Sequence, residues 1–401
     1  MAHKVVIVGL ENLNLGDRVI EDTCKYLVKE LSPDLKIKTM NLFPEEELME
    51  DFKSKYSKTD VLIEKFSQKY GNNFICQMLD FSKWYRFSKK GTSVYKYYED
   101  NLKKSKMVII AGGGLIKYSR ENFWNAIYSI ISYCSRARIH VYFNAIGVEG
   151  FDKSNFYCQL LKYSLNKKCV KVISTRDDID TLKKYVSNKR TELKVVGDPA
   201  LWSCEKYNIQ DIQKNNLIGV GLIRGKIFTD YGIDFSEEQI LQAYVGIIKE
   251  LESRGLRWQL FCNGLKSDYR MGKDILNYLG LPVEEQYLAP RPTKAKSLVK
   301  RISEYKAIIG ARLHSNIIAA AYSVPSVALV WNEKLKFFGK QIEHEERFFT
   351  KEDFKNPLCV VNKLEQAMSE GYDELIIQNL KLSTRVSLED FINKELNNCK
   401  K

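Results

Sequence analysis

Two side chains that can carry charge stand close together in the stretch GARLHSNIIAAAYSVPSVALV, which runs from Gly310 to Val330. Arg312 offers a planar, permanently charged guanidinium that can grip a phosphate or a carboxylate. His314 can gain or lose a proton near neutral pH. The two residues therefore suit a reaction that binds an anionic substrate and transfers a proton. The structural alternative is that Arg312 is a surface ion-pair partner and that His314 caps a helix.

The residues around Arg312 and His314 predict a strand, a tight turn, a helix and a second strand. The apolar residues 307–309 predict a buried strand, 316–322 a helix and 327–330 the next strand. In a parallel sheet such a turn lies at the carboxyl end of its strand, where open α/β sheets bind ligands. The helix amino terminus also offers N–H groups to an anion. The pattern therefore predicts an anion site at this turn.

Four further turns follow apolar strands and carry glycine or polar residues. GLENLNLGD and AGGGLIKY contain glycines, which let backbone N–H groups approach a ligand because no Cβ is in the way. STRDD and GLIRG each place an arginine after a strand. Several polar strand ends are a stronger indication of a binding cleft than any one of them. The candidate residues from these turns are Asn14, Asp17, Gly113, Gly114, Arg176 and Arg224.

Strand and helix patterns alternate along both halves of the chain, which indicates βαβ units and parallel sheets. We therefore predict an α/β fold with two Rossmann-like, doubly wound domains that face a cleft. The predicted domains are residues 1–205 and 206–401, with a polar linker at 203–216 and a long final helix at about 372–398. Four other helices are predicted at about 17–31, 236–254, 268–279 and 294–303.

An insert of about residues 45–105 interrupts the first domain with a helical pattern rich in lysine and aromatic side chains. Its most basic part reads FSKWYRFSKKGTSVYKYYEDNLKKSK. Such a segment can contact an anionic membrane surface or a lipid-linked substrate. The alternative is a solvated amphipathic insert.

The composition favours anionic partners, because 63 Lys and Arg against 50 Asp and Glu give a net charge of +13. No zinc-finger, RRM or basic-zipper pattern occurs, so we expect no nucleic acid partner. Nine cysteines without a CxxC pair and four histidines without HExxH predict reduced thiols and no metal site. Without a signal peptide or a membrane-length apolar run, we expect a cytoplasmic protein, with the inner face of the membrane as a further location.

Several motifs resemble the polysaccharide pyruvyl transferase family in the same order. They are NLNLGDRVI, AGGGLI, ISTRDD, GDPALW, GARLHSNIIAAAYSVPSVAL and WNEKLKFFGKQI, and they run from about residue 5 to about residue 345. The resemblance implies a fold like that of the two-domain GT-B glycosyltransferases. It also implies transfer of the pyruvyl group of phosphoenolpyruvate onto sugar hydroxyls as a ketal, in synthesis of bacterial capsule, exopolysaccharide or cell-wall glycan. Phosphoenolpyruvate is then the donor substrate, and no cofactor is implied.

Carried onto this sequence, the resemblance places Arg312, Leu313 and His314 in the donor site. A second donor arginine matches either Arg176 or Arg224, and both alternatives stay open.

Three positions within or just after these motifs bear on the resemblance. Lys334 falls on a lysine of the family, which assigns it to the donor site as well. Trp331 stands where a tyrosine-type aromatic is more usual, and Asp180 stands where the family often has serine.

The chemistry accounts for these residue types, because phosphoenolpyruvate carries a phosphate and a carboxylate that arginine can bind. To form a ketal, its methylene carbon must be protonated before a sugar oxygen adds to the neighbouring carbon. His314 is the candidate general acid. Arg312 should favour the neutral imidazole, and we expect the bound phosphate dianion to reverse this.

Acceptor activation has several candidates. Asp17 and Asp198 could each take a proton from a sugar hydroxyl, although Asp17 could instead cap its helix and Asp198 could hold a turn. Asn14 could orient a hydroxyl, and the backbone of Gly113 and Gly114 could contact the acceptor. The acceptor sugar is free, lipid-linked or nucleotide-linked.

Two other functions compete with pyruvyl transfer. A GT-B glycosyltransferase that uses a nucleotide sugar would have the same architecture, but GARLHSN contains no acidic residue to grip a ribose. A non-catalytic protein that binds acidic polysaccharide would use the basic insert, and it would tolerate alanine at Arg312 and His314.

Overall fold

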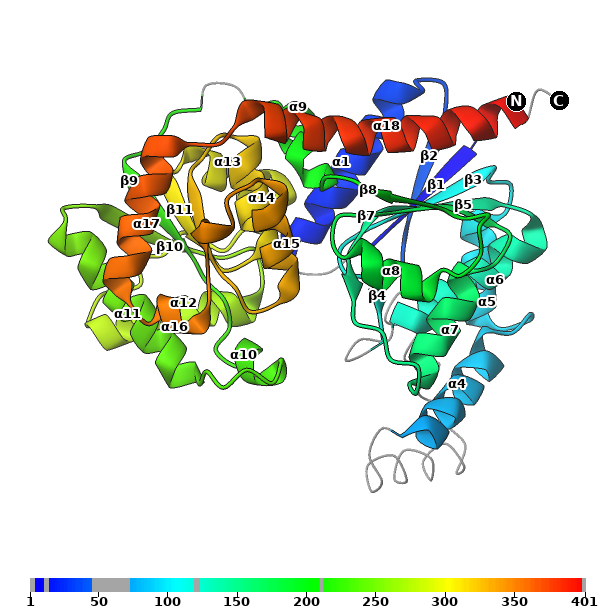
Figure 1. Ribbon diagram of the computed structural model, residues 1–401, viewed down its shortest axis with the longest axis horizontal. Coiled ribbons are helices and arrows are strands. Elements are labelled where there is room, and N and C mark those ends of the chain that lie inside the picture. The colour runs from blue at the N-terminus through cyan, green and yellow to red at the C-terminus, as the bar shows by residue number, and fades with distance from the viewer. Residues whose placement is uncertain (1–3, 11–13, 45–72, 119–122, 210–211, 399–401) are drawn as a thin grey trace. The chain divides into compact units, whose positions relative to one another are not determined.

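The computed structural model describes residues 4–10, 14–44, 73–118, 123–209 and 212–398 (Figure 1). The chain divides into two compact units. Unit 1 consists of Met1–Glu11, Cys24–Val196 and Arg385–Lys401, and unit 2 consists of Asn12–Thr23 and Gly197–Thr384.

These units differ from the predicted domains 1–205 and 206–401. Helix α1 (Leu15–Leu31) begins in unit 2 and ends in unit 1, and α18 (Glu374–Asn398) does the same. A boundary drawn at one point of the sequence cannot describe helices that contribute to two cores. The predicted linker is also partly structured, because it contains helix α9 (Ser203–Tyr207).

Unit 1 is built on a six-stranded parallel sheet in the order β2-β1-β3-β5-β7-β8. Val5, Val6, Ile7 and Val8 in β1 are buried on both faces, as expected for a central strand of a parallel sheet. A separate pair, β4 (Ile116–Lys117) and β6 (Val148–Glu149), is also parallel. The strands of the main sheet are β1 (Lys4–Gly9), β2 (Lys36–Asn41), β3 (Met107–Ala111), β5 (His140–Ile146), β7 (Val170–Thr175) and β8 (Glu192–Val195).

The helices that belong wholly to unit 1 include two from the predicted basic insert. Residues 45–72 of that insert lie outside the described part of the chain, and the part from residue 73 onward is mainly helical, in agreement with its pattern. The helices are α4 (Phe74–Ser88), α5 (Ser93–Leu102), α6 (Phe123–Ala137), α7 (Phe156–Leu165) and α8 (Ile179–Tyr185).

Unit 2 contains a five-stranded parallel sheet in the order β10-β9-β11-β12-β13. From β9 the chain goes to β10 on one side, and it then passes to β11 on the other side. The strand order therefore reverses between β9 and β11, which makes their carboxyl ends the switch point where open α/β sheets bind ligands. The strands are β9 (Leu217–Gly221), β10 (Arg257–Phe261), β11 (Ala307–Gly310), β12 (Ser326–Leu329) and β13 (Phe348–Phe349).

The helices that were predicted in unit 2 agree with the observed ones to within three residues at each end, whereas those at Glu333–Gln341 and Pro357–Glu370 were not predicted. The largest difference is at the start of α14, which begins at Leu313 and not at residue 316, so that His314 lies within the first turn. The helical elements of unit 2 are η1 (Pro199–Trp202), α9, α10 (Ile227–Asp230), α11 (Glu237–Ser253), α12 (Lys266–Leu279), α13 (Ala295–Glu304), α14 (Leu313–Ala321), α15 (Glu333–Gln341), η2 (Glu345–Arg347), α16 (Lys351–Phe354) and α17 (Pro357–Glu370).

The architecture confirms the predicted fold class, since each unit is a parallel sheet with helices of the Rossmann-like kind (Figure 1). Within the described ranges, every helix is too short or too polar to cross a membrane.

Candidate functional site

The turn between β11 and α14 is shaped by Gly310 and Asn316. Asn316 Nδ2 donates to the carbonyl oxygens of Gly310 at 3.3 Å and Arg312 at 3.1 Å. A Cβ on Gly310 would lie 2.7 Å from the same nitrogen, so a larger residue there would disturb the turn. This geometry fixes Arg312 immediately before the helix and His314 in its first turn, at the carboxyl end of β11.

Arg312 is held by a carboxylate that comes from α12. Its Nε and Nη2 donate to the two oxygens of Asp268 at 2.9 and 2.7 Å. The Asp268 side chain is fully buried, and 12% of the Arg312 side chain is exposed. Arg312 also lies over the indole of Trp331, with its Cζ 5.6 Å from the ring centroid. The guanidinium is therefore fixed in direction, and its Nη1 lies outside the Asp268 pair.

The nearby acidic residue corrects one sequence argument. GARLHSN itself contains no carboxylate, but the fold brings Asp268 to Arg312 from 44 positions away. Asp268 was not among the candidate residues. It lies in the first turn of a predicted helix that follows the strand RWQLFCNG, and this position was the only signal for it.

Arg224 lies at the same switch point as Arg312. Its backbone N–H donates to Asp268 Oδ1 at 3.0 Å, so both arginines contact one carboxylate. The Arg224 side chain forms a more exposed ion pair with Asp230, with 2.5 Å between Nη1 and Oδ2. The ends of β9 and β11 thus bring two candidate arginines together.

His314 faces a second carboxylate, that of Asp198. The distance from His314 Nε2 to Asp198 Oδ2 is 3.9 Å, and both side chains are buried, at 7% and 1% exposure. The other oxygen of Asp198 accepts from the backbone N–H of Ala200 at 2.8 Å, which caps η1. Asp198 therefore holds a turn, as the structural alternative suggested, and also faces the imidazole.

This environment differs from the one expected for His314. Arg312 was expected to favour the neutral imidazole, but its charge is offset by Asp268. The Asp198 carboxylate would stabilise a protonated imidazole, whereas burial of the ring opposes its charge.

The start of α1 packs against His314. A Cβ on Gly16 would lie 2.2 Å from His314 Nδ1, so only glycine fits beside the ring without displacement. The N–H of Leu15 donates to the carbonyl of Asn263 at 3.0 Å, and Asn263 Oδ1 accepts from Ser315 Oγ at 2.7 Å. The first turn of α1 is thus tied to the first turn of α14.

Asn14 and Asp17 accompany this contact. Asn14 Nδ2 donates to Asp17 Oδ2 at 3.2 Å, and Asp17 is buried in the first turn of α1. Both therefore belong to unit 2, together with His314, Asp198 and Arg312.

Three candidate residues lie in unit 1. The N–H of Gly147 donates to the carbonyl of Gly113 at 3.0 Å, and a Cβ on Gly147 would lie 2.9 Å from Gly114 Cα and 2.7 Å from Asp177 Oδ2. Arg176 is buried, with its Nε 3.9 Å from Asp177 Oδ1. Gly113, Gly114 and Arg176 therefore form a second group, at the carboxyl ends of β3, β5 and β7.

The two remaining candidates also lie in unit 2. Leu313 is the first residue of α14 and is buried, and Lys334 lies half-buried in the first turn of α15. Both follow strands of the unit 2 sheet at their carboxyl ends.

A further group in the described part of unit 2 has ligand atoms within 4.8 Å of one another, namely those of His344, Glu346 and Glu370. Arg347 already occupies it, with its Nη2 3.0 Å from Glu370 and its Nε 3.6 Å from Glu346. This guanidinium is fully buried, so the group is better explained as an ion-pair network than as a metal site.

Comparison with known families gives one match. A family model described as polysaccharide pyruvyl transferase matches residues 14–333. The span contains every candidate site residue except Lys334, which lies one position beyond it. A comparison with curated protein sequences finds no match.

Solved structures show the same fold at low sequence identity. The UDP-GlcNAc 2-epimerase of Methanocaldococcus jannaschii has a TM-score of 0.58 and 10% identity, covering 97% of this chain and 99% of that one. The UDP-GlcNAc 2-epimerase of Neisseria meningitidis, bound to UDP-GlcNAc, has a TM-score of 0.54 and 12% identity, covering 98% and 100%. The α,α-trehalose 6-phosphate synthase of Burkholderia multivorans has a TM-score of 0.51 and 8% identity, covering 100% and 97%. These similarities establish a GT-B-type fold and carry no information on substrate.

Proposed function

The chain belongs to the polysaccharide pyruvyl transferase family, and we propose that it moves the pyruvyl group of phosphoenolpyruvate onto two hydroxyls of a sugar as a ketal. The product would be part of a bacterial capsule, exopolysaccharide or cell-wall glycan. The observation that carries this proposal is the arrangement at the unit 2 switch point, where Asp268 holds Arg312 through two hydrogen bonds and the Asp198 carboxylate faces the His314 ring.

The donor would bind where β9 and β11 end. Arg312 is fixed by Asp268, and its Nη1 lies outside that pair. The guanidinium can therefore donate to a phosphate or carboxylate with little further loss of side-chain conformational entropy on binding. The backbone N–H of Arg224 contacts the same Asp268, which places this residue at the same strand ends, and we take Arg224 as the second donor arginine for this reason. The N–H groups at the start of α14 and the Lys334 ammonium would add to the attraction.

His314 would supply the proton that starts the reaction. Asp198 stabilises the imidazolium, which can protonate the methylene carbon of phosphoenolpyruvate. The neighbouring carbon then takes up one sugar oxygen, and the second sugar oxygen displaces phosphate to close the ketal ring. Both hydroxyl protons must leave, one to the neutral imidazole and the other to a base or to phosphate.

Asp17 is the preferred base among the candidates. Asp17 follows Gly16, the residue of α1 that packs against the His314 ring, so it lies next to the proposed acid along the chain. Asn14 donates to Asp17 and would orient its carboxylate.

Thermal unfolding with phosphoenolpyruvate, phosphate, UDP and UDP-sugars at matched ionic strength tests this proposal. A ligand that binds only the folded protein stabilises it by about 2.7 kcal/mol at 100 times its dissociation constant. We expect a shift with phosphoenolpyruvate that disappears in Arg312→Ala and persists in His314→Ala. We also expect His314→Ala to lower turnover by about 10² to 10⁴.

The response to UDP and UDP-sugars distinguishes pyruvyl transfer from the competing function. A shift with UDP or a UDP-sugar alone would favour a glycosyltransferase of the same fold. Shifts with both kinds of ligand would indicate a pyruvyl transferase with a nucleotide-linked acceptor.

A further inference from the structure

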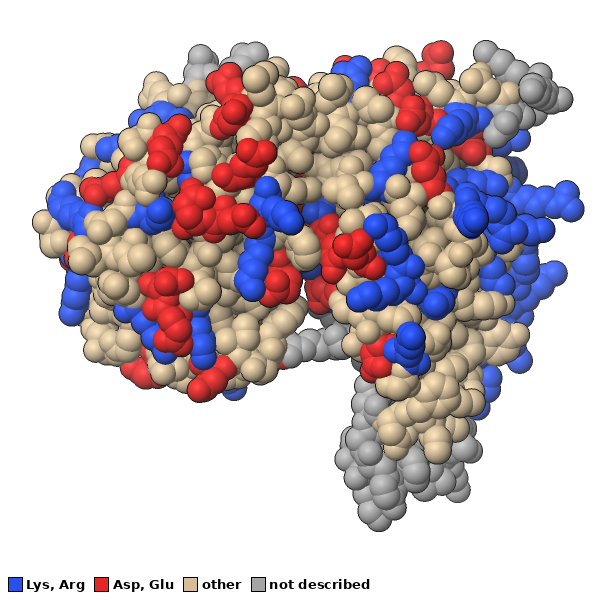
Figure 2. All heavy atoms as spheres, in the orientation of Figure 1, with Lys and Arg blue, Asp and Glu red and all other residues tan. Residues whose placement is uncertain are grey.

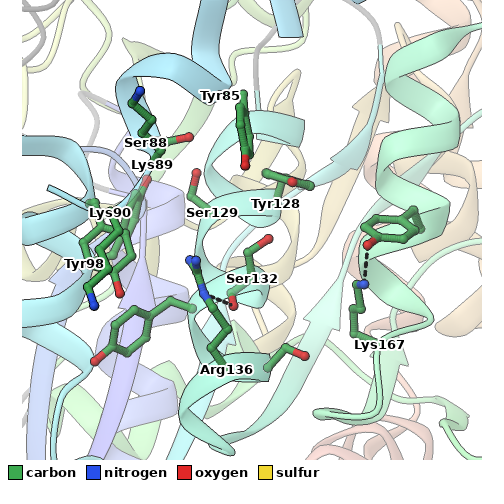
Figure 3. Close-up of a pocket in the computed structure, with 14 residues that line it drawn as sticks. Tyr85, Ser88, Lys89, Lys90, Tyr98, Tyr128, Ser129, Ser132, Arg136 and Lys167 are labelled. Carbon is green, nitrogen blue, oxygen red and sulfur yellow. Dashed lines mark hydrogen bonds between the residues drawn. The ribbon is translucent and has the colours of Figure 1, made fainter. Parts of the chain in front are cut away.

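A separate cavity lies within unit 1 and contains none of the candidate residues named above. It has a volume of about 470 Å³ and is lined by residues of α4, α5, α6 and α7 and of the loop between α4 and α5 (Figure 3). This volume falls in the range of small-molecule sites in proteins. The cavity is therefore large enough for more than a simple ion.

The charge of the cavity lining has one sign. Lys89, Lys90, Arg136 and Lys167 line it, and no Asp or Glu is among the described residues that do so. On the face drawn in Figure 2, Lys and Arg also gather on parts of unit 1. Four cations without a lining carboxylate favour an anionic ligand.

The inner wall is already ordered by hydrogen bonds. Tyr98 is 1% exposed and donates to the carbonyl of Leu42 at 3.1 Å. Ser129 Oγ accepts from Trp84 Nε1 at 3.0 Å and donates to the carbonyl of Asn125 at 2.9 Å. A ligand would therefore meet a preformed surface and would not have to order it.

Arg136 is also positioned before any ligand binds. Its Nε donates to the carbonyl of Ser132 at 3.2 Å (Figure 3). Its Cζ lies 5.3 Å from the centroid of the Tyr95 ring. Neither contact uses the two terminal nitrogens of the guanidinium, Nη1 and Nη2, which can donate to phosphate oxygens. Burial raises the pKa of the Tyr128 and Tyr133 hydroxyls, so these remain protonated hydrogen-bond donors.

We propose that this cavity binds the phosphate group of a phosphorylated ligand, with Arg136, Lys89 and Lys90 gripping the phosphate and the tyrosines contacting the attached group. Lys167, in the loop that follows α7, lies over the Tyr163 ring and contributes a further charge. The phosphate could come from a soluble sugar phosphate or from a lipid headgroup, since the chemistry of recognition is the same. The proposal does not depend on pyruvyl transfer in unit 2.

The rate of acetylation at each lysine, measured by mass spectrometry, tests this cavity. It reports ligand binding at the cavity separately from binding at the donor site. With pyrophosphate at twice its dissociation constant, about two thirds of the cavities are filled, so acetylation at Lys89 and Lys90 should slow about threefold relative to chloride at matched ionic strength. Lys153 and Lys189 are exposed in the same unit and serve as internal controls that should not change.

Variants test whether the cavity itself provides the protection. Arg136→Gln should abolish the protection of Lys89 and Lys90, because it removes the guanidinium that would bind the phosphate and leaves both lysines in place. The double variant Lys153→Gln/Lys189→Gln removes two exposed charges of unit 1 outside the cavity and should leave the protection intact. Circular dichroism should show that all variants are folded, since Arg136, Lys153 and Lys189 are exposed.

Vesicles distinguish the two sources of phosphate. Phosphatidylcholine vesicles with and without phosphatidylglycerol replace pyrophosphate in the same experiment. Protection by pyrophosphate identifies a soluble ligand, and protection by the anionic vesicles alone identifies a headgroup. Lack of protection by both, equal protection at Lys153 and Lys189, or protection that survives Arg136→Gln would overturn the proposal.

Discussion

Substitution of Gly16 by alanine should disturb His314 more than it disturbs the fold. The added Cβ would lie 2.2 Å from His314 Nδ1, and an ordinary contact begins at 3.4 Å. The imidazole or the start of α1 must therefore move by the difference, 1.2 Å. Because His314 Nε2 lies only 3.9 Å from Asp198, a movement of this size changes how the two groups interact.

Two opposing terms set the size of the stability change. Overpacking of a buried contact costs about 1–3 kcal/mol. Replacement of glycine by alanine in a helix gains up to about 1 kcal/mol. We therefore expect Gly16→Ala to lower the free energy of unfolding by about 0–3 kcal/mol in a urea titration. Turnover should fall by about 10², because a displacement near 1 Å at a reacting group has that effect.

NMR titration of the histidine side chains measures the local effect directly. The sequence has four histidines, so the His314 signal can be assigned by comparison with His314→Ala. In Gly16→Ala the imidazole should lose its proton at lower pH than in the wild type, because it has moved away from the Asp198 carboxylate. An unchanged titration together with unchanged turnover would refute the predicted clash.

A double-mutant cycle separates this clash from other effects of the alanine. The three atoms nearest the added Cβ all belong to the His314 side chain, so His314→Gly removes them. Gly16→Ala should then cost nothing, or stabilise the protein, in the His314→Gly background. An equal cost in both backgrounds would show that the strain arises elsewhere.

Three further predictions concern buried or capping carboxylates. Asp268→Ala should destabilise the protein by about 3–5 kcal/mol in urea unfolding, because it leaves Arg312 without its buried partner, and it should also weaken the thermal shift with phosphoenolpyruvate. Asp198→Asn should lower turnover. As pH rises, the activity of this variant should begin to decline at a lower pH than that of the wild type, because the imidazolium loses the carboxylate that faces it. An unaltered pH profile would exclude this role. Asp178→Ala should cost about 1 kcal/mol at pH 7, because it removes the N-cap of α8. Burial alone would raise the pKa of Asp178, but hydrogen bonds from Thr181 and from the N–H of Asp180 outweigh it and hold the pKa below its ordinary value. A lowered folded-state pKa stabilises the protein above the unfolded pKa of about 3.9. The difference in stability between wild type and Asp178→Ala should therefore shrink as pH falls below 4, and a constant difference would contradict the capping role.

Local patterns in the sequence were sufficient to predict the turn that carries Arg312 and His314. The apolar run before Gly310 and the small-residue run after Asn316 each correspond to one buried element. The start of α14 was predicted three residues late because Leu313 to Ser315 show no helical periodicity of their own. Their helical conformation follows from contacts with Asn263 and Gly16, which are distant in sequence.

Contacts between distant segments could not be predicted in the same way. Asp268 and Arg312 are 44 positions apart, and nothing near Asp268 marks it as an arginine partner. The same holds for the contact of Gly16 with His314, since a glycine in a turn has many explanations. The distribution of α1 over both units follows from such contacts, which is why a single domain boundary was inadequate.

The buried ion pair of Arg312 with Asp268 changes how the positive charge of the unit 2 site should be understood, because the pair is neutral as a whole. Net attraction for an anionic donor must then come from groups outside this pair, such as Lys334 and the N–H groups at the start of α14. The pair instead fixes the direction of the guanidinium, so that it does not have to reorganise during the reaction. For this reason, removal of Asp268 should weaken donor binding even though it increases the net positive charge of the site.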